Sequence, residues 1–359
     1  MPTSALLTGR KSASRAGGTL SPGARSLAQV SVLAENIPPR DRDAFLADAQ
    51  RHRRELLAHC YRMTGSLHDA EDLVQETYLR AWKSYAGFEG RSSVRTWLYR
   101  IATNTSLTAL EGRSRRPLPS GLGRPAADPH AEITEHLEQA WLEPLPDIHD
   151  APDDPQTIAG TRESVRLAFI AALQHLSPRQ RAVLVLRDVL GWKAAEVAEA
   201  VGTSTAAVNS LLQRARALLE TIGPSRDDVL LAPDSAEAKD LLSRYIAAFE
   251  SYDMGALVEL FTADSVWEMP PFDTWYSGPG DIVELSRYKC PAEGPGDMRF
   301  VVTTANGQPA AAMYMRNPQT GRHEAFQLHV LDIRADGIAH VVAFMDPTLF
   351  EKFGLEPHR

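Results

Sequence analysis

The chain has 359 residues, 43% of them hydrophobic and 23% charged, and a formal net charge of −8. This length and composition suit two or three ordinary globular domains. No stretch reaches 18 uninterrupted apolar residues, so we expect no membrane span and a cytoplasmic protein. The two cysteines, Cys60 and Cys290, lie far apart without the spacing of zinc ligands. The sequence therefore indicates neither a metal site nor a cofactor.

The charge is unevenly distributed along the chain. Residues 91–116 contain six Arg and one Glu, a local net charge of +5. Residues 117–160 contain nine acidic residues and one Arg, and residues 235–359 contain eighteen acidic and ten basic residues, so each of these two segments carries −8. A basic stretch within an acidic chain is typical of a nucleic-acid contact. We expect the acidic segments to compete with DNA for that basic surface.

The first part of the chain divides into a tail and a helical segment. Residues 1–40 are basic and rich in Ser and Gly, without the apolar core of a signal peptide, and are expected to be a disordered tail. Residues 41–114 are expected to be helical, because apolar residues recur at three- and four-residue steps. Within this segment, an acidic helix that begins near Asp69 is followed by a Gly-containing loop and a basic helix.

Residues 115–160 are expected to be an acidic, Pro-rich linker, because they lack a sustained regular spacing of apolar residues. Within this linker, residues 130–147 form an island that is expected to be a short helix ending near Glu143 and Pro144.

The helical pattern returns in residues 161–222. Ser177, Pro178 and Gln180 have the order of a helix start with a capping box. A short helix ending at Gly202 and a longer one capped by Ser204 form the pattern of a helix-turn-helix. In residues 235–352 one amphipathic helix precedes several short β-like runs, which predicts an α+β domain with an antiparallel sheet.

Several of these segments resemble a known family. The runs DAEDLVQE, FEGRSS and TWLYRIATN, and the later run GWKAAEVAEAVGTSTAAVNSLLQRAR, resemble regions 2 and 4 of extracytoplasmic-function (group IV) sigma-70 factors. These two regions cover roughly residues 41–114 and 161–220. The run FTADSVWEMPPFDTWYSGPGDI resembles SnoaL-like domains of the nuclear-transport-factor-2 superfamily. The resemblance implies two all-α sigma modules and a cone-shaped α+β domain.

The resemblance also implies a function and partners. A sigma factor binds core RNA polymerase at the β′ clamp and the β flap, recognises the −35 and −10 promoter elements, and promotes DNA melting. The C-terminal domain would tune this activity in cis, with a small-molecule ligand as a further partner. It would thus replace a separate anti-sigma factor. Such a protein is not an enzyme.

Site residues follow from the same resemblance. The residues expected to bind polymerase are Asp69, Asp72, Gln75 and Glu76. Those expected at the −10 element, where stacking and base contacts hold melted DNA open, are Arg91, Ser92, Arg95, Trp97, Arg100 and Asn104. Those expected at the −35 element, in a recognition helix and its flank, are Lys193, Thr205, Ala206, Asn209, Ser210, Gln213 and Arg214. Arg91 departs from the acidic residue common in the family, so the family's −10 base preference is not carried over. Asn209 and Leu211 stand where many members have Arg, so we expect weaker binding to the −35 element or a different −35 sequence.

The C-terminal domain carries an aromatic and acidic cluster. The residues expected to line a ligand pocket are Trp267, Glu268, Phe272, Trp275, Tyr276 and His329, although packing of a hydrophobic core is an alternative for the aromatic members. In the linker, Trp141 to Pro146 resembles a Trp-Leu-Pro-rich motif that would serve as a latch.

Two other functions stay open at this point. One is a stand-alone, ligand-sensing DNA-binding regulator, which would have no use for Asp72, Gln75 and Glu76. The other is a cyclase or isomerase activity, which His323, His329 and His340 together with Asp332 would serve.

Overall fold

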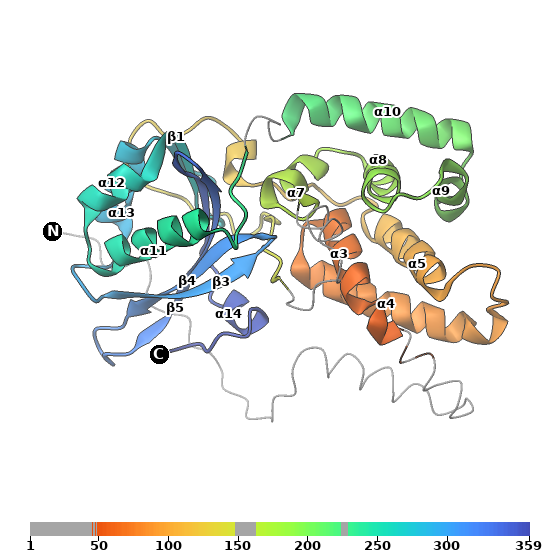
Figure 1. Cartoon of the computed structure of the whole chain (residues 1–359), viewed down its shortest axis with the longest axis horizontal. Coiled ribbons are helices and arrows are strands. Elements are labelled where there is room, and N and C mark those ends of the chain that lie inside the picture. The colour runs from red at the N-terminus through yellow and green to blue at the C-terminus, as the bar shows by residue number, and fades with distance from the viewer. Residues whose placement is uncertain (1–44, 46, 48, 148–162, 224–228) are drawn as a thin grey trace.

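The computed structural model describes residues 45, 47, 49–147, 163–223 and 229–359 (Figure 1). The expected N-terminal tail and residues 148–160 of the expected linker lie outside this set. The first helical module contains α3 (Arg53–Thr64), α4 (Leu67–Ser84), η1 (Tyr85–Gly87) and α5 (Val94–Ala109). The second helical module contains α7 (Leu167–Leu173), α8 (Pro178–Leu184), the π-helical η3 (Val185–Val189), α9 (Ala194–Val201) and α10 (Thr205–Ile222).

The amphipathic helix α4 places its apolar side in the core of the first helical module. Its buried side includes Leu73, Val74, Tyr78 and Trp82, as the periodicity predicts. The helix starts at an N-cap in which the Ser66 hydroxyl accepts a hydrogen bond from the Asp69 amide. This start fixes which residues of α4 face outward.

The helix-turn-helix of the second helical module is confirmed. Ser177 and Gln180 form the expected capping box at the start of α8. Gly202 ends α9 in the left-handed conformation, with φ of 66°. The Ser204 hydroxyl then accepts a hydrogen bond from the Ala207 amide and caps α10.

The helix expected within residues 130–147 is wrong. This segment runs without a helix and forms isolated bridges from Glu135 to Phe272 and from Pro146 to Ala305. The element between α5 and this segment is the 3-10 helix η2 (Pro119–Gly121). Leu142 and Leu145 are buried in the core of the molecule. Burial of these two leucines in an extended chain, next to two prolines that disfavour helix, outweighs the local helical preference.

The tail domain, residues 229–359, contains a six-stranded sheet with helices. Its helices are α11 (Ala236–Glu250), α12 (Met254–Leu260), α13 (Pro279–Lys289) and α14 (Leu349–Lys352). Its strands are β1 (Phe261–Glu268), β2 (Trp275–Ser277), β3 (Met298–Ala305), β4 (Gln308–Arg316), β5 (His323–Arg334) and β6 (Gly337–Phe344), in the order β2-β1-β6-β5-β4-β3. The expected α+β class is confirmed, but the sheet is mixed. The sequence predicts an antiparallel sheet, and this is wrong for one pair of strands. Strands β1 and β6 are parallel, because the last strand runs beside the first in the same direction.

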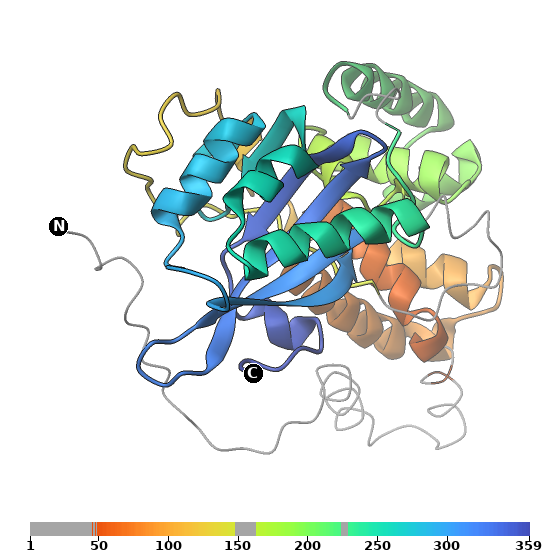
Figure 2. The same cartoon turned by 60° about the vertical axis from the view of Figure 1, so that its left-hand side comes forward.

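The two faces of this sheet belong to different cores. One face packs under α11, α12 and α13, which lie in front of it in Figure 2. The other face contributes Ala310, Tyr314, Val330 and Phe344 to a core that also contains buried residues of both helical modules. The tail domain is therefore continuous with the helical part of the molecule.

Candidate polymerase and DNA interfaces

The outward face of α4 carries three of the four residues predicted to bind polymerase. Asp72 is exposed, and Gln75 and Glu76 are half-buried. Asp72 lies 3.8 Å from His68, and Glu76 accepts a hydrogen bond of 2.7 Å from Arg80. Exposed ion pairs of this kind contribute at most about 1 kcal/mol. They leave this face available to a basic partner.

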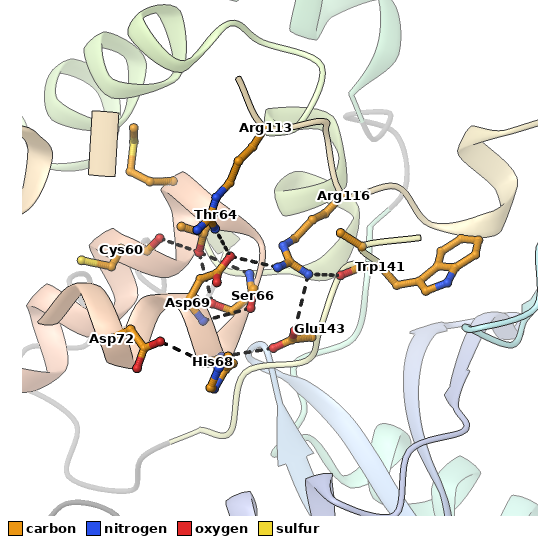
Figure 3. A network of polar contacts seen from close by, with 12 residues as sticks. Cys60, Thr64, Ser66, His68, Asp69, Asp72, Arg113, Arg116, Trp141 and Glu143 are labelled. Carbon is orange, nitrogen blue, oxygen red and sulfur yellow. Dashed lines mark hydrogen bonds and ion pairs between the residues drawn. The ribbon is translucent and has the colours of Figure 1, made fainter. Parts of the chain in front are cut away.

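Asp69, the fourth of these residues, is already engaged (Figure 3). Its carboxylate accepts hydrogen bonds of 2.9 Å from Arg113 and from Arg116, which follow α5. Arg116 also donates to the Trp141 carbonyl oxygen at 3.0 Å and lies 3.5 Å from the Glu143 carboxylate. Asp69 therefore belongs to an internal network with the linker, in contrast to Asp72 on the same helix.

Glu143 attaches the linker to the start of α4. Its carboxylate accepts a hydrogen bond of 3.1 Å from the His68 amide, and its own amide donates to the Gly65 carbonyl oxygen at 3.0 Å. A carboxylate in this position also interacts favourably with the positive end of the helix dipole. The Glu143 carbonyl oxygen accepts a 2.7 Å bond from the Tyr61 hydroxyl.

The loop before α5 presents polar groups to solvent. Arg91 and Ser92 are exposed, and Arg91 pairs with Glu89 at 2.9 Å. Trp97 is half-buried, with its ring centroid 4.8 Å from that of Phe88. Trp97 thus packs against this loop while part of its side chain remains at the surface.

Arg95 is held within the first helical module. Its guanidinium donates to the Glu55 carboxylate at 2.6 Å and lies 5.0 Å from the Tyr99 ring centroid. Burial raises the pKa of Glu55, but the hydrogen bonds and charge of Arg95 outweigh this effect, and the net pKa is lowered. Glu55 is therefore ionised at neutral pH, and Arg95 has to leave it to reach a DNA phosphate.

Arg100 and Asn104, on the outward face of α5, contact α9 of the second helical module. Arg100 donates to the Glu199 carboxylate at 2.6 Å, and Asn104 donates to the Ala200 carbonyl oxygen at 3.0 Å. Beside them the Tyr99 ring lies 6.1 Å from that of Trp192. Two of the residues predicted to contact the −10 element therefore bind another part of the same chain.

The residues predicted to contact the −35 element are all exposed: Lys193, Thr205, Ala206, Asn209, Ser210, Gln213 and Arg214. The opposite side of α10 is buried through Val208, Leu212 and Ala215, and the helix packs on α8 and α9. Nearby Arg216 forms an ion pair with Asp188. The side of α10 that is predicted to contact the −35 element is thus exposed to solvent.

Comparison with known proteins identifies the family. Residues 49–116 match the model of Sigma-70 region 2, residues 166–219 that of Sigma-70, region 4, and residues 242–343 that of a SnoaL-like domain. The ECF RNA polymerase sigma factor SigG of Mycobacterium tuberculosis is 69% identical over 92% of this chain and 90% of its own length. The chain belongs to the ECF sigma factors.

A second relative of this sigma factor supports the arrangement of its domains. SigJ of Mycobacterium tuberculosis is 31% identical over 68% of this chain and 72% of its own length. The crystal structure of SigJ matches with a TM-score of 0.57 and 24% identity, covering 87% of this chain and all of the other. The three-part fold is therefore shared with a solved sigma factor.

In this sigma factor, four of the residues predicted to line a ligand pocket are buried together inside the tail domain: Trp267, Phe272, Tyr276 and His329. His329 lies 2.8 Å from the Tyr245 hydroxyl and 2.7 Å from the Gln327 side-chain oxygen. Burial lowers the pKa of His329 to about 3, so the imidazole is neutral. Trp275 is half-buried, and its indole donates to the Gly123 carbonyl oxygen at 3.2 Å. The aromatic residues make a core, while ligand binding there stays a prediction.

Glu268 lies on the other face of the sheet, where it contacts the linker. It is fully buried and accepts hydrogen bonds from the Ser120 amide at 2.7 Å and from His340 at 2.6 Å. His340 also lies 3.8 Å from Asp332. Burial alone lowers the pKa of His340, but the two carboxylates outweigh it and raise the pKa to about 10. The imidazole is thus a cation between two acids at this interface.

Sequence reasoning included Glu143 in the run Trp141 to Pro146 that was predicted to be a latch, but it missed other residues that join the three parts of this sigma factor: Glu199, Ala200 and Asn306. The Asn306-Gly307 pair between two β-like runs is a strong hairpin signal and would have located that turn. No pattern in one sequence identifies the distant partners of these residues.

Metal binding and membrane insertion find no support in the parts that the structure describes. No three His, Cys, Asp or Glu side chains there come together as a metal site. None of the helices described has the length and apolar character that crossing a membrane requires.

Proposed function

We propose that the free sigma factor is self-restrained, with the second helical module covering the face of the first module that contacts the −10 element. The observation that carries this proposal is the pair of contacts from Arg100 and Asn104 to α9. A carboxylate bound to Arg100 occupies the place of a DNA phosphate, and a carbonyl oxygen bound to Asn104 occupies the place of a base edge. DNA and α9 therefore compete for the same side chains.

The proposal implies an open form, in which the second helical module no longer covers the first. This form offers three binding surfaces. The acidic face of α4, with Asp72, Gln75 and Glu76, binds core RNA polymerase. The loop before α5 and α5 itself contact the melted −10 element. The exposed side of α10 contacts the −35 element in the major groove. Because a sigma factor serves RNA polymerase, we also place its action in the cytoplasm.

The tail domain acts in cis as a regulator and has no enzymatic role in this proposal. The sheet face that carries Glu268, His340 and Asp332 packs against the linker and the second helical module. His329 is enclosed by Tyr245 and Gln327, and its pKa is lowered by burial. A general base needs access to a substrate and a pKa near the working pH, and His329 has neither property.

The test uses promoters that the protein itself selects. Core RNA polymerase and the full chain transcribe a library of templates with randomised upstream DNA, and the transcripts are sequenced to obtain a promoter. The labelled non-template strand of that promoter is then the single-stranded probe for fluorescence anisotropy with the sigma factor alone.

The decisive variant is Glu199→Arg, because it removes the partner of Arg100 and places two cations together. The control is Glu220→Arg, the same charge change at an exposed position of α10. We expect Glu199→Arg to bind the single-stranded probe about tenfold more tightly than the control does, equal to about 1.4 kcal/mol. Equal affinities of the two variants would contradict self-restraint.

A further inference from the structure

The turn between β3 and β4 carries a buried asparagine. Asn306 is fully buried, with φ of 58°, and is followed by Gly307 with φ of 69°. Asn followed by Gly is the preferred pair for a tight hairpin turn with two positive φ angles. Hairpin turns lie mostly at the surface, however, and turn formation alone does not explain the burial of this side chain.

The Asn306 side chain contacts three separate segments of the chain. Its amide nitrogen donates to the Tyr61 hydroxyl of α3 at 2.8 Å and to the Val165 carbonyl oxygen, just before α7, at 2.6 Å. Its amide oxygen accepts from the Leu145 amide of the linker at 2.8 Å. Both amide hydrogens and the carbonyl of one side chain are thus used by the first helical module, the linker and the second helical module.

The β3–β4 turn, the linker and the two helical modules meet at this junction, and neighbouring groups add further contacts to it. The Asn306 backbone amide donates to the Leu145 carbonyl oxygen at 2.8 Å, and the Gly307 amide donates to the Asp147 carboxylate at 2.8 Å. The Gln308 side-chain oxygen accepts from the Leu167 amide, at the start of α7, at 2.9 Å. The turn is therefore bound on one side to the linker and on the other to the first residues of α7.

We propose that Asn306 is a positioning residue that sets how the two helical modules lie relative to one another. This inference rests on the proposed self-restraint, and names the residue of the tail domain that maintains it. An amide side chain is required, because only Asn and Gln offer two donors and an acceptor in one group. Loss of the amide leaves the buried Tyr61 hydroxyl, Val165 carbonyl and Leu145 amide with fewer partners, which is costly in a dry interior.

The main variant is Asn306→Gly. Glycine adopts positive φ readily, so the hairpin turn is kept while every side-chain bond to the helical modules is removed. The control is Asn317→Ala, in the turn between β4 and β5, where the side chain caps its own turn through the amides of Gln319 and Thr320. A second variant, Tyr61→Phe, removes one partner of Asn306 from the opposite side of the junction, together with the bond from the Tyr61 hydroxyl to the Glu143 carbonyl oxygen, and changes no residue of the tail domain.

The measurements are deuterium exchange of backbone amides and binding of the single-stranded promoter probe. For Asn306→Gly we expect faster exchange in α5 and α9, unchanged exchange in β4 and β5, and about fivefold tighter binding of the probe than for Asn317→Ala, equal to about 1 kcal/mol. Tyr61→Phe is expected to shift both quantities in the same direction by a smaller amount. Wild-type exchange in α5 and α9 for both variants would overturn the assignment of Asn306.

Failure of this inference is distinguishable from failure of the proposed function. Tighter binding by Glu199→Arg without any change in Asn306→Gly and Tyr61→Phe overturns the role of Asn306 and leaves self-restraint intact. No change in any of the three variants overturns both. Faster exchange in β4 and β5 of Asn306→Gly would mean that this substitution has disturbed the tail domain itself. The role of Asn306 is then judged from Tyr61→Phe, in which the tail domain is unaltered.

Discussion

The side-chain nitrogen of Asn104 lies 3.0 Å from the carbonyl oxygen of Ala200, the next-to-last residue of α9. Carbonyl groups in the last turn of a helix lack partners within the helix, and Asn104 supplies one. A hydrogen bond of this kind contributes only about 1 kcal/mol net, because water replaces it when it breaks. The contact is therefore weak enough for promoter DNA or polymerase to displace.

The proposed polymerase-binding surface is tested by charge reversal on α4. We expect the double substitution Asp72→Arg and Glu76→Arg to weaken binding to core RNA polymerase at least about tenfold, since unlike charges at an interface steer and orient association. Pull-down and run-off transcription from the selected promoter measure the effect. The matched control is the double substitution Glu237→Arg and Glu259→Arg, at exposed positions of α11 and α12. Unimpaired binding by the double variant would exclude this face.

The proposed −35-binding surface is tested through base preference. Asn209 and Gln213 are exposed on the recognition side of α10, and each is able to form a bidentate pair with adenine. We expect Asn209→Ala and Gln213→Ala each to lose about 1–3 kcal/mol of discrimination at one base pair of the selected −35 element. Transcription from templates with single substitutions in that element measures the loss. An unchanged preference at every position would remove both residues from readout.

Packing of the linker is tested with two leucines that lie five residues apart. Leu142 is 1% exposed and Leu137 is 66% exposed. We expect Leu142→Ala to destabilise the protein by about 2–5 kcal/mol, because it leaves a cavity in the core that joins the modules. Thermal unfolding of Leu137→Ala, which changes no buried contact, is expected to follow wild type within about 0.5 kcal/mol. Similar midpoints for the two variants would mean that the linker is not part of that core.

A pH dependence follows from His340. The pKa of His340 is raised to about 10 in the folded protein, whereas an unperturbed His has a pKa of about 6.5. The stabilising contribution of His340 is therefore complete below about pH 6.5 and is lost as pH rises toward 10, with a slope of at most about 1.4 kcal/mol per pH unit.

The measurement for His340 is the midpoint of thermal unfolding between pH 7 and pH 9.5. We expect the wild-type midpoint to fall more steeply with pH than that of His340→Gln, whose side chain does not titrate. Parallel curves for the two proteins would show that His340 carries no extra proton in the folded state.

Local patterns were sufficient for much of this fold. The capping box at Ser177 and the Gly202 turn lie where the sequence places them, because each depends on neighbours within four residues. The apolar period of α4 predicts which of its residues are buried. The prediction of a helix in the linker failed because Leu142 and Leu145 are buried by distant segments, which no local pattern reveals.

The candidate site was likewise predictable from local patterns only in part. Exposure of Asn209 and Gln213 follows from the period of α10 alone. The engagement of Asp69 by Arg113 and Arg116, and of Asn104 by Ala200, depends on how separate modules pack. Contacts of this kind require knowledge of tertiary structure, since residues 44 to 96 positions apart in the chain form them.

The sheet of the tail domain completes a core that begins in α3 and α4, and this has a consequence for newly made protein. Tyr314, Val330 and Phe344 leave the ribosome more than about 90 residues after the last helix of the second module has been synthesised. At about 5–20 residues per second, this delay lasts roughly 5–20 seconds. During that interval the apolar surfaces of both helical modules lack their cover, and the nascent chain is most open to chaperones and to a first encounter with polymerase.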